Sequence, residues 1–328
     1  MKKKIVFFVL LLKVMSTSVA AQTPTDSVVQ GARRYVARNF SEARTFNLYW
    51  ETAPSHDYTL KQNGKEIENG RIRYMNTINF SATVPVLLLR NFSLYANGHF
   101  NSYQFEASDK VTDNISTVFS RNQGGYNYYE GTITGTYRTK IGNKPLLLTA
   151  TGAGDGWNKN FEKVQAMLSA IVVLKQSATT SLCAGLYGTT LYDKLPVVPI
   201  ITYWHQFNRD LSIDITLPSR TYLRYQFNSN QRFSIGASME NEHFYMESGI
   251  ETLPKVSFFN KTTIKPGIVY EYIINNHFYL TARAGAAAII KGGLYKRNRK
   301  SVNGDPYVEF TQPMTPFFNL GFSYNLFK

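Results

Sequence analysis

The segment that decides the fold is RIRYMNTINFSATV, residues Arg71–Val84. Its residues alternate between two faces, Ile72, Tyr74, Asn76, Ile78, Phe80, Ala82 and Val84 on one and Arg71, Arg73, Met75, Thr77, Asn79, Ser81 and Thr83 on the other. A period of two indicates a strand with one apolar and one polar face. The segment is longer than the roughly nine to eleven residues with which a tilted strand crosses a membrane. It therefore predicts a membrane-crossing strand that places Arg71 and Arg73 at one rim.

The first 21 residues have the features of a secretory signal peptide. Three lysines precede an apolar run from Ile5 to Leu12, and small residues lead to Ala21. This pattern predicts export and cleavage after Ala21. An apolar run of this length is too short for a transmembrane helix.

Residues 22–43 differ from the rest of the chain because their apolar residues recur every four positions. Val28, Ala32, Val36 and Phe40 form this line, which predicts one short helix. The helix is either a mobile leader or a plug inside a pore. We expect the remaining residues, 44–328, to form a single β-barrel.

Composition narrows the class of protein. The chain carries 22 Tyr, 22 Phe and a formal net charge of +14, and its single cysteine excludes an internal disulfide. No apolar run after the signal peptide is long enough for a transmembrane helix. Basic charge on an exported protein favours anionic lipid or anionic solutes as partners, and we expect no nucleic-acid binding.

Alternating segments continue to the end of the chain and predict an all-β, antiparallel, up-and-down barrel of about fourteen strands. The expected strands are 44–51, 71–84, 91–104, 126–139, 145–152, 162–175, 180–191, 198–206, 211–217, 220–228, 232–243, 262–274, 278–290 and 316–327. Three prolines interrupt residues 192–220, so twelve strands is the alternative count.

Connections between these segments alternate in length. Residues 140–144 and 275–277 form tight turns, whereas 62–70, 106–125 and 291–316 are longer polar segments expected to be loops. Outer-membrane barrels have short periplasmic turns and long external loops. A soluble β-sandwich would also alternate, but with shorter strands and more Lys and Glu on its outward faces.

The last predicted strand resembles the assembly signal of outer-membrane proteins. The signal consists of a polar residue, a glycine two positions later and alternating hydrophobic residues up to a terminal aromatic. The matching residues are Asn319, Gly321, Tyr324, Leu326 and Phe327. Lys328 follows Phe327, a departure from the usual aromatic-last ending. The resemblance implies recognition by the barrel-assembly machinery.

The chain also resembles an uncharacterised family, a domain of unknown function, of bacterial outer-membrane β-barrel proteins. The residues that carry this resemblance lie between Gly185 and Met246 and include GLYGTT and PVVPIITYWHQFNRDLSIDITLP. The family implies a fold and a location in the Gram-negative outer membrane, with its lipid and lipopolysaccharide as surroundings. It implies no activity and no site residues.

If the apolar faces contact lipid, a set of charged residues points into the lumen. The expected lumen-lining residues are Arg71, Arg73, Arg138, Arg220, Arg224, Arg232, Arg283, Glu130, Asp214 and Glu240. An arginine excess in a pore concentrates anions. The same charges could instead pair across a narrow lumen and fill it, and both interpretations stay open.

No motif for catalysis, cofactor binding or metal binding is visible. We therefore predict a non-enzymatic, porin-like channel or transporter for a small solute, either anionic or amphiphilic, without cofactor or metal. The alternatives are a structural or assembly barrel without transport, and a lipid-modifying enzyme using His243 beside Glu240 and Glu242. The sequence leaves the oligomeric state open.

Overall fold

A computed structural model of the chain describes residues 44–109, 118–119, 125–190, 197–247, 254–275, 277–298 and 304–326. The predicted signal peptide, the predicted helix at 22–43 and Phe327 lie outside these residues. The boundaries expected for the first two segments therefore stay predictions.

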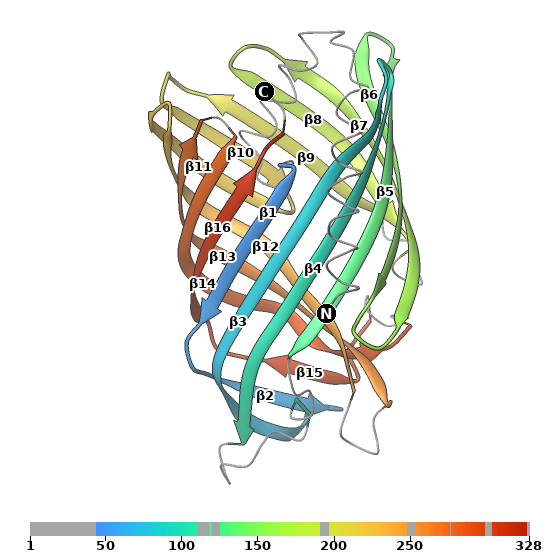
Figure 1. Cartoon of the computed structure of the whole chain (residues 1–328), viewed down its shortest axis with the longest axis vertical. Helices are drawn as coiled ribbons and strands as arrows, with labels where there is room; N and C mark the ends of the chain where they lie inside the picture. Colours follow the sequence, from blue (N-terminus) through green and yellow to red (C-terminus); the bar gives the residue numbers. More distant parts are fainter. Residues whose placement is uncertain are drawn as a thin grey trace, which may run out of the picture.

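The described residues form one antiparallel sheet that closes into a barrel (Figure 1). Its strands are β1 (Phe46–Ala53), β2 (His56–Gln62), β3 (Lys65–Leu88), β4 (Phe92–Asp109), β5 (Tyr126–Ile141), β6 (Lys144–Gly156), β7 (Phe161–Gln176), β8 (Thr180–Thr189), β9 (Val197–Gln206), β10 (Leu211–Leu217), β11 (Arg220–Asn228), β12 (Gln231–Glu247), β13 (Val256–Ile274), β14 (Phe278–Lys296), β15 (Val308–Thr311) and β16 (Thr315–Tyr324).

Fourteen of these described strands make the membrane-crossing wall, as predicted, because β1 closes the barrel by pairing with both β16 and β3. The two further strands, β2 and β15, continue the wall at one end. There β14 pairs with β15, β15 with β2, and β2 with β3. Between β14 and β3, the wall therefore consists of β16 and β1 in its main part and of β15 and β2 at that one end.

The two ends of the barrel differ. The end that carries the connections 89–91, 142–143, 177–179, 207–210, 229–230 and 275–277 is called the turn end here, and the opposite end, which carries β2 and β15, is called the loop end. Figure 1 shows β2 and β15 together at the loop end. The first residues of β1 and the last of β16 pair at the turn end.

The outer surface of the barrel carries the apolar faces predicted from the alternation. On β16, for example, Phe318, Leu320 and Phe322 are exposed, while Asn319 and Ser323 point inward and are buried. The other exposed apolar residues of the wall include Leu48, Ile78, Phe80, Ile133, Tyr137, Leu148, Leu168, Leu186, Ile201, Leu223, Tyr225, Ile235, Ile264, Ile268, Tyr270 and Leu280. A water-soluble protein rarely exposes so large an apolar surface, whereas a bilayer covers it.

The segment Arg71–Val84 contains a β-bulge that the sequence analysis did not foresee. Ile72 pairs with Ala107 but Tyr74 pairs with Glu106, so Arg73 is the extra residue on β3. A bulge reverses the faces of the residues that follow it. Accordingly Ile72 is buried inside with 4% of its surface exposed, whereas Tyr74 is 45% exposed on the outside.

The segment 62–70, expected to be a loop, is part of a β2–β3 hairpin. Asn63 and Gly64 have φ angles of 50° and 76° and form its two-residue turn. An Asn-Gly pair favours such a turn because both residues tolerate a positive φ. The expected loop at 291–316 likewise contains β15, which forms only because β2 and β14 offer it free edges.

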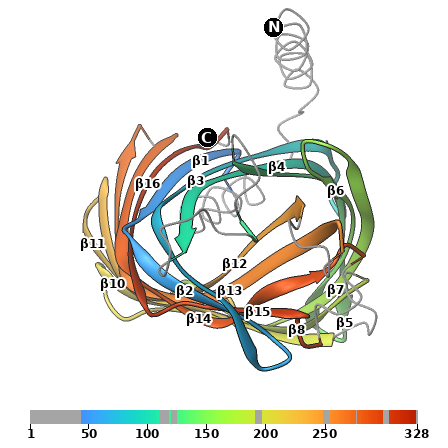
Figure 2. The ribbon, with the colours of Figure 1, turned by 90° about the horizontal axis from the view of Figure 1, so that it is seen from below.

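A buried aromatic core closes the loop end. Figure 2, viewed from this end, shows β12 and β13 crossing the opening of the barrel. Phe244 on β12 packs against Tyr126 on β5 and Phe259 on β13, with ring centroids 4.5 and 4.8 Å apart. The rest of this core includes Tyr58, Leu60, Ile72, Tyr103, Phe119, Met246, Leu294, Val308 and Phe310.

Candidate functional site

A cavity of about 550 Å³ lies inside the barrel behind the aromatic core. Its walls come from β1, β3 and β4 on one side and from β11, β12, β13, β14 and β16 on the other. Polar and charged side chains dominate the lining, in keeping with the polar faces of the alternating strands. Two clusters of ion pairs hold most of the charge.

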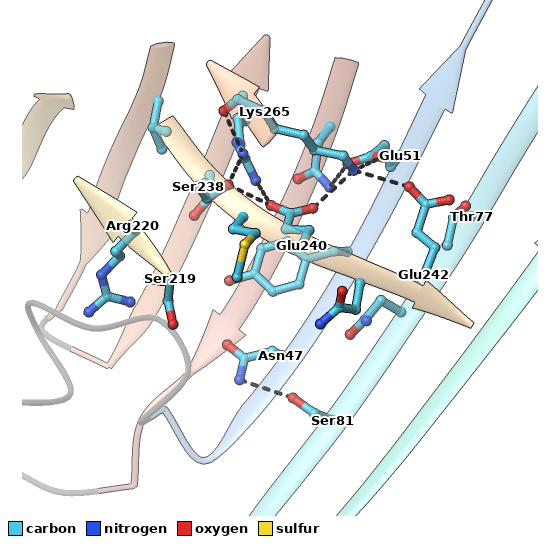
Figure 3. A pocket seen from close by; sticks show the side chains of 18 of the residues that line it. Asn47, Glu51, Thr77, Ser81, Ser219, Arg220, Ser238, Glu240, Glu242 and Lys265 are labelled. Carbon is cyan, nitrogen blue, oxygen red and sulfur yellow. Dashed lines mark hydrogen bonds and ion pairs between the residues drawn. The ribbon is translucent and has the colours of Figure 1, made fainter. Parts of the chain in front are cut away.

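The first cluster, called the lysine cluster, is centred on Lys265 of β13. This side chain is only 3% exposed, and its Nζ lies 2.9 Å from Glu240 and 3.6 Å from Glu242. It also pairs with Glu51 on β1, and Figure 3 shows Lys265 lying between these carboxylates. The cluster is completed by Lys261, which pairs with Glu242, and by Arg283, which pairs with Glu240.

The members of the lysine cluster balance in charge. Three cations, Lys261, Lys265 and Arg283, face three carboxylates, Glu51, Glu240 and Glu242. A buried charge is tolerated only when it is paired and hydrogen-bonded. The lysine cluster therefore ties β13 to β1, β12 and β14 inside the lumen, where a soluble protein would have an apolar core.

The second cluster, called the arginine cluster, contains Arg44, Arg220, Arg224 and Arg232 with two acids, Asp214 and Glu271. Arg232 Nε donates to Glu271 over 2.8 Å, and Arg220 Nε donates to Asp214 over 3.2 Å. Arg44 also pairs with Glu271, and Arg224 with Asp214. Among the described residues of this cluster there are four cations and two carboxylates, and Arg220, Arg224 and Arg232 line the cavity.

Apart from Glu51, the opposite wall of the cavity carries no Lys, Arg, Asp or Glu among the described lining residues, and it is rich in amides. Asn79 donates to Asn101 over 2.7 Å, and Asn47 donates to Ser81 over 3.2 Å. These side chains come from β1, β3 and β4 at lumen-facing positions. Amide groups both donate and accept, so this wall offers hydrogen bonds without adding charge.

A further part of the lumenal surface, on β6 to β9, carries a row of apolar residues among polar ones such as Thr149, Ser169 and Thr202. Ile171 on β7 is paired with Leu147 on β6 and with Gly185 on β8, which in turn is paired with Ile200 on β9. Directly paired residues point to the same face of a sheet. Trp204 shares this face because it is paired with Asp214 of the arginine cluster. The lumen is therefore amphipathic around its circumference.

The structure brings some of the predicted lumen-lining residues together and separates others. The cavity lining includes Arg220, Arg224, Arg232, Arg283 and Glu240. Asp214 lies behind it, fully buried and bonded to Arg224. The remaining members of the predicted set occupy other places, described next.

Arg138 and Glu130 are on the lumen-facing side of β5 but are not among the residues that line the cavity, although Glu130 is paired with the cavity-lining His99. Arg138 donates to Ser93 over 3.2 Å, and Glu130 accepts a hydrogen bond of 3.0 Å from Tyr128. The polar face of β5 carries both residues.

Arg71 and Arg73 lie outside the lumen, contrary to the prediction. Arg71 pairs with Asp57 at 3.0 Å and Arg73 with Glu106 at 3.1 Å, and about half of each arginine side chain is exposed. The bulge at Arg73 is the cause, because it turns Ile72 inward and therefore turns Arg71 outward.

Residues that the prediction missed include the centre of the lysine cluster. Lys265 and Glu271 lie on the polar face of the predicted strand 262–274, opposite Ile264 and Ile268. Alternation alone could have placed them in the lumen. Glu51 and Arg44 are brought to their partners only by the closure of the barrel, which no local pattern reveals.

The residues of the predicted assembly signal make contacts where β16 pairs with β1. Asn319 donates to Glu51 over 3.4 Å, and the backbone N–H of Leu326 donates to Thr45 over 3.0 Å. Gly321 lies under the Tyr49 ring, where an added Cβ would lie 2.2 Å from a ring carbon. Tyr324 stacks on Phe46. Recognition by the assembly machinery stays a prediction.

No group of three or more His, Cys, Asp and Glu side chains suited to a metal ion occurs in the part of the chain that the structure describes. Over the same residues, no helix is long and apolar enough to cross a membrane. His243 lines the cavity and packs edge to face against Tyr128, with ring centroids 4.4 Å apart.

A closed antiparallel barrel of fourteen described strands, with an apolar exterior and a charged lumen, defines the class of transmembrane β-barrels. Within this class, the chain belongs to the family described as Domain of unknown function (DUF6268), which matches residues 129–325. The match runs from β5 to the end of β16 and includes the segment that carried the resemblance.

Solved structures with a similar arrangement are barrels of distant sequence. An outer membrane channel from Pseudomonas putida F1 is 9% identical, with a TM-score of 0.41, over 85% of this chain and 94% of that chain. A Pseudomonas aeruginosa FadL homologue is 9% identical, with a TM-score of 0.35, over 85% and 90%. The transport unit of an Escherichia coli autotransporter is 10% identical, with a TM-score of 0.37, over 93% and 100%.

These similarities are too weak to carry an argument about function. No curated protein sequence matches the chain significantly.

Proposed function

We propose that this protein is an outer-membrane β-barrel that binds and transports a small amphiphilic solute with an anionic group. Three features support a location in the outer membrane: the apolar exterior, the even number of described wall strands and the predicted signal peptide. The turn end then faces the periplasm and the loop end faces outward. Outer-membrane lipid and lipopolysaccharide surround the barrel, and the barrel-assembly machinery inserts it.

The cavity is the observation that carries the proposal for transport. Its volume of about 550 Å³ suits a small ligand. Arg220, Arg224 and Arg232 line one side of this cavity. Outside the cavity lining, Ile171, Ile200 and Trp204 add apolar side chains to the same lumenal face of the sheet. A solute with an anionic head and an apolar chain matches both features.

A structural barrel without transport is the second candidate function. The observation that favours it is the aromatic core, because Phe244, Tyr126 and their neighbours block the direct path through the loop end. A lumen that is filled for stability would bind no solute. The two candidates are therefore separated by a binding measurement.

We expect no catalysis, and this stays a prediction. The ring of His243 packs against Tyr128, and Glu240 and Glu242 are engaged by Lys265. A lipid-modifying activity would be supported if the purified protein hydrolysed a phospholipid and the His243→Ala variant did not.

Trp204 allows the binding proposal to be tested. The purified protein is placed in phosphatidylcholine vesicles and titrated with 12-bromododecanoate, an anionic amphiphile whose bromine quenches nearby tryptophan. We expect a saturable component of the quenching that disappears in the Trp204→Phe variant, since Trp204 is on the lumenal face. The other two tryptophans of the chain make this subtraction necessary. Quenching that persists unchanged without Trp204 would contradict binding in the lumen and favour the structural barrel.

A further inference from the structure

On one side of the barrel, the strands of the wall are short and do not extend as far toward the loop end as their neighbour β12. Strand β10 has 7 residues and β11 has 9, whereas the neighbouring β12 has 17. A tilted strand needs about nine to eleven residues to cross the hydrocarbon layer, so β10 is too short to cross it and β11 only just reaches that length. Both short strands are complete at the turn end, where β11 continues into β12 through a two-residue turn. The missing length is therefore on the loop side.

The last contact between β11 and β12 fixes the position of this gap. Arg220 pairs with Ser238, and the N–H of Met239 donates to the carbonyl of Ser219 over 2.7 Å. Beyond this point, β12 continues to Glu247 with β13 on one edge and without β11 on the other. The described wall therefore has an open edge above the β10–β11 turn.

Beyond this edge, β12 no longer behaves as part of a wall. In a wall strand, consecutive side chains point alternately to the lumen and to the lipid. Here consecutive residues of β12 all line the cavity, from Ser238 through Met239, Glu240, Asn241 and Glu242 to His243. The strand has turned into the lumen, as Figure 2 shows, and its edge borders the cavity. Phe244 of β12 then packs on Tyr126 of β5.

The cavity reaches the gap. Ser219 and Arg220, at the end of the shortened wall, are among its lining residues. The outer side of the same wall is apolar, with Leu217, Leu223 and Ile235 exposed. The aromatic core closes the axial path at the loop end, so the gap leads sideways from the cavity to the hydrocarbon layer.

We propose that the gap between the β10–β11 turn and β12 is a lateral portal through which a single-chain anionic amphiphile moves between the outer leaflet and the cavity. The inference rests on the proposed function. Arg220, which is 14% exposed at the inner edge of the portal, receives the head group first, followed by Arg224 and Arg232 deeper in the cavity. The apolar chain remains in contact with lipid until the head group has moved inward.

Two cysteine variants test this portal in a background that lacks Cys183, the single cysteine of the chain. Ser219→Cys places a label at the portal, and Ser229→Cys places the same label in the turn at the opposite end of β11. Each variant, in a Cys183→Ser background, is modified with a rhodamine maleimide and placed in phosphatidylcholine vesicles. The rate and the final extent of Trp204 quenching by 12-bromododecanoate are then measured.

We expect the adduct at position 219 to slow the quenching at least tenfold without reducing its final extent, and the adduct at 229 to have no effect. A slower rate with the adduct at 229 alone would overturn the portal in favour of axial access, and the proposed function would stand. Equal rates for both adducts and the unlabelled protein would also overturn the portal. Absence of quenching in the unlabelled protein would overturn both proposals.

A second measurement separates lipid contact from binding. A bimane label at position 219 should be quenched by phospholipids brominated on their acyl chains, and the same label at 229 should be quenched much less. A label at 219 that is unaffected by brominated lipid would place the gap outside the hydrocarbon layer and overturn the portal, whatever the solute does.

Discussion

The lysine cluster and the arginine cluster lie in the same lumen but differ in charge balance. The lysine cluster matches three cations with three carboxylates, whereas the described arginine cluster has four cations and two carboxylates. Removing one member of a balanced buried set leaves an uncompensated charge, which destabilises the wall, whereas a site in which cations outnumber carboxylates attracts anions. Charged residues in the lumen therefore do not by themselves indicate a pore. The number of cations relative to carboxylates in each cluster is more informative.

The largest effect is expected from removing the centre of the lysine cluster. Lys265→Met leaves Glu51 with Asn319 as its remaining partner among those described above. Breaking a buried ion pair costs about 3–5 kcal/mol. We expect the free energy of unfolding to fall by this amount, measured by urea titration of the vesicle-inserted protein.

Adding Glu51→Gln to the Lys265→Met variant serves as the control, because it removes the stranded charge. Recovery of part of the lost stability is expected. No loss in the single variant would show that the lysine cluster does not hold the wall together.

The next effect concerns ligand binding by the arginine cluster. In Arg220→Gln, Asp214 keeps Arg224 as a partner, so the fold is expected to persist. We expect the affinity for 12-bromododecanoate to fall about tenfold, which corresponds to about 1.4 kcal/mol. Affinity for the uncharged 12-bromododecanol should not change. An equal loss for both amphiphiles would contradict recognition of the head group.

A smaller effect is expected at the seam that joins β1 to β16. In Gly321→Ala, the new methyl group would collide with the Tyr49 ring, two residues from Glu51. Overpacking of this kind costs about 1–3 kcal/mol. The urea midpoint should fall. In the double variant that also carries Tyr49→Ala, the total loss of stability should be smaller than the sum of the losses in the two single variants. If the two losses are purely additive, Gly321 does not act through contact with Tyr49, and a role of Gly321 in assembly alone is favoured.

The smallest effect is expected outside the lumen. Arg71 and Asp57 form an exposed ion pair, and such pairs contribute about 0–1 kcal/mol. Arg71→Ala should leave both unfolding and amphiphile binding nearly unchanged. A loss of binding comparable to that of Arg220→Gln would contradict the placement of Arg71 outside the lumen.

Near the loop end, Arg297 offers a contrast to the lumenal arginines. A hydrogen bond from its Nε to Glu162, together with the charge of that carboxylate, raises the pKa of the Arg297 guanidinium. Half of the Arg297 side chain is exposed, so this pair is screened by solvent. It links the segment after β14 to β7 without entering the cavity.

The fourteen wall strands could be predicted because lipid imposes an apolar residue at every second position. Strand β11 shows the principle, with Leu223 and Tyr225 exposed and Tyr222 and Arg224 buried. Even the short strands in the proline-interrupted region were predicted, since the period of two persists on both sides of Pro218.

The remaining features depend on contacts that the alternation does not encode. The bulge at Arg73 changes the face of Ile72 without interrupting the apparent pattern. Strand β15 needs the edges of β2 and β14 to form. The lysine cluster joins Glu51 to Lys265, which are 214 positions apart, and only the closure of the barrel brings them together.

The aromatic core at the loop end has a consequence for the cell that makes this protein. Phe244, Phe259 and Phe310 pack together at the loop end, so the described residues block the axial path there. We therefore expect the barrel to be electrically silent in a planar bilayer. A barrel that conducts no ions adds no leak to a membrane, however many copies that membrane holds.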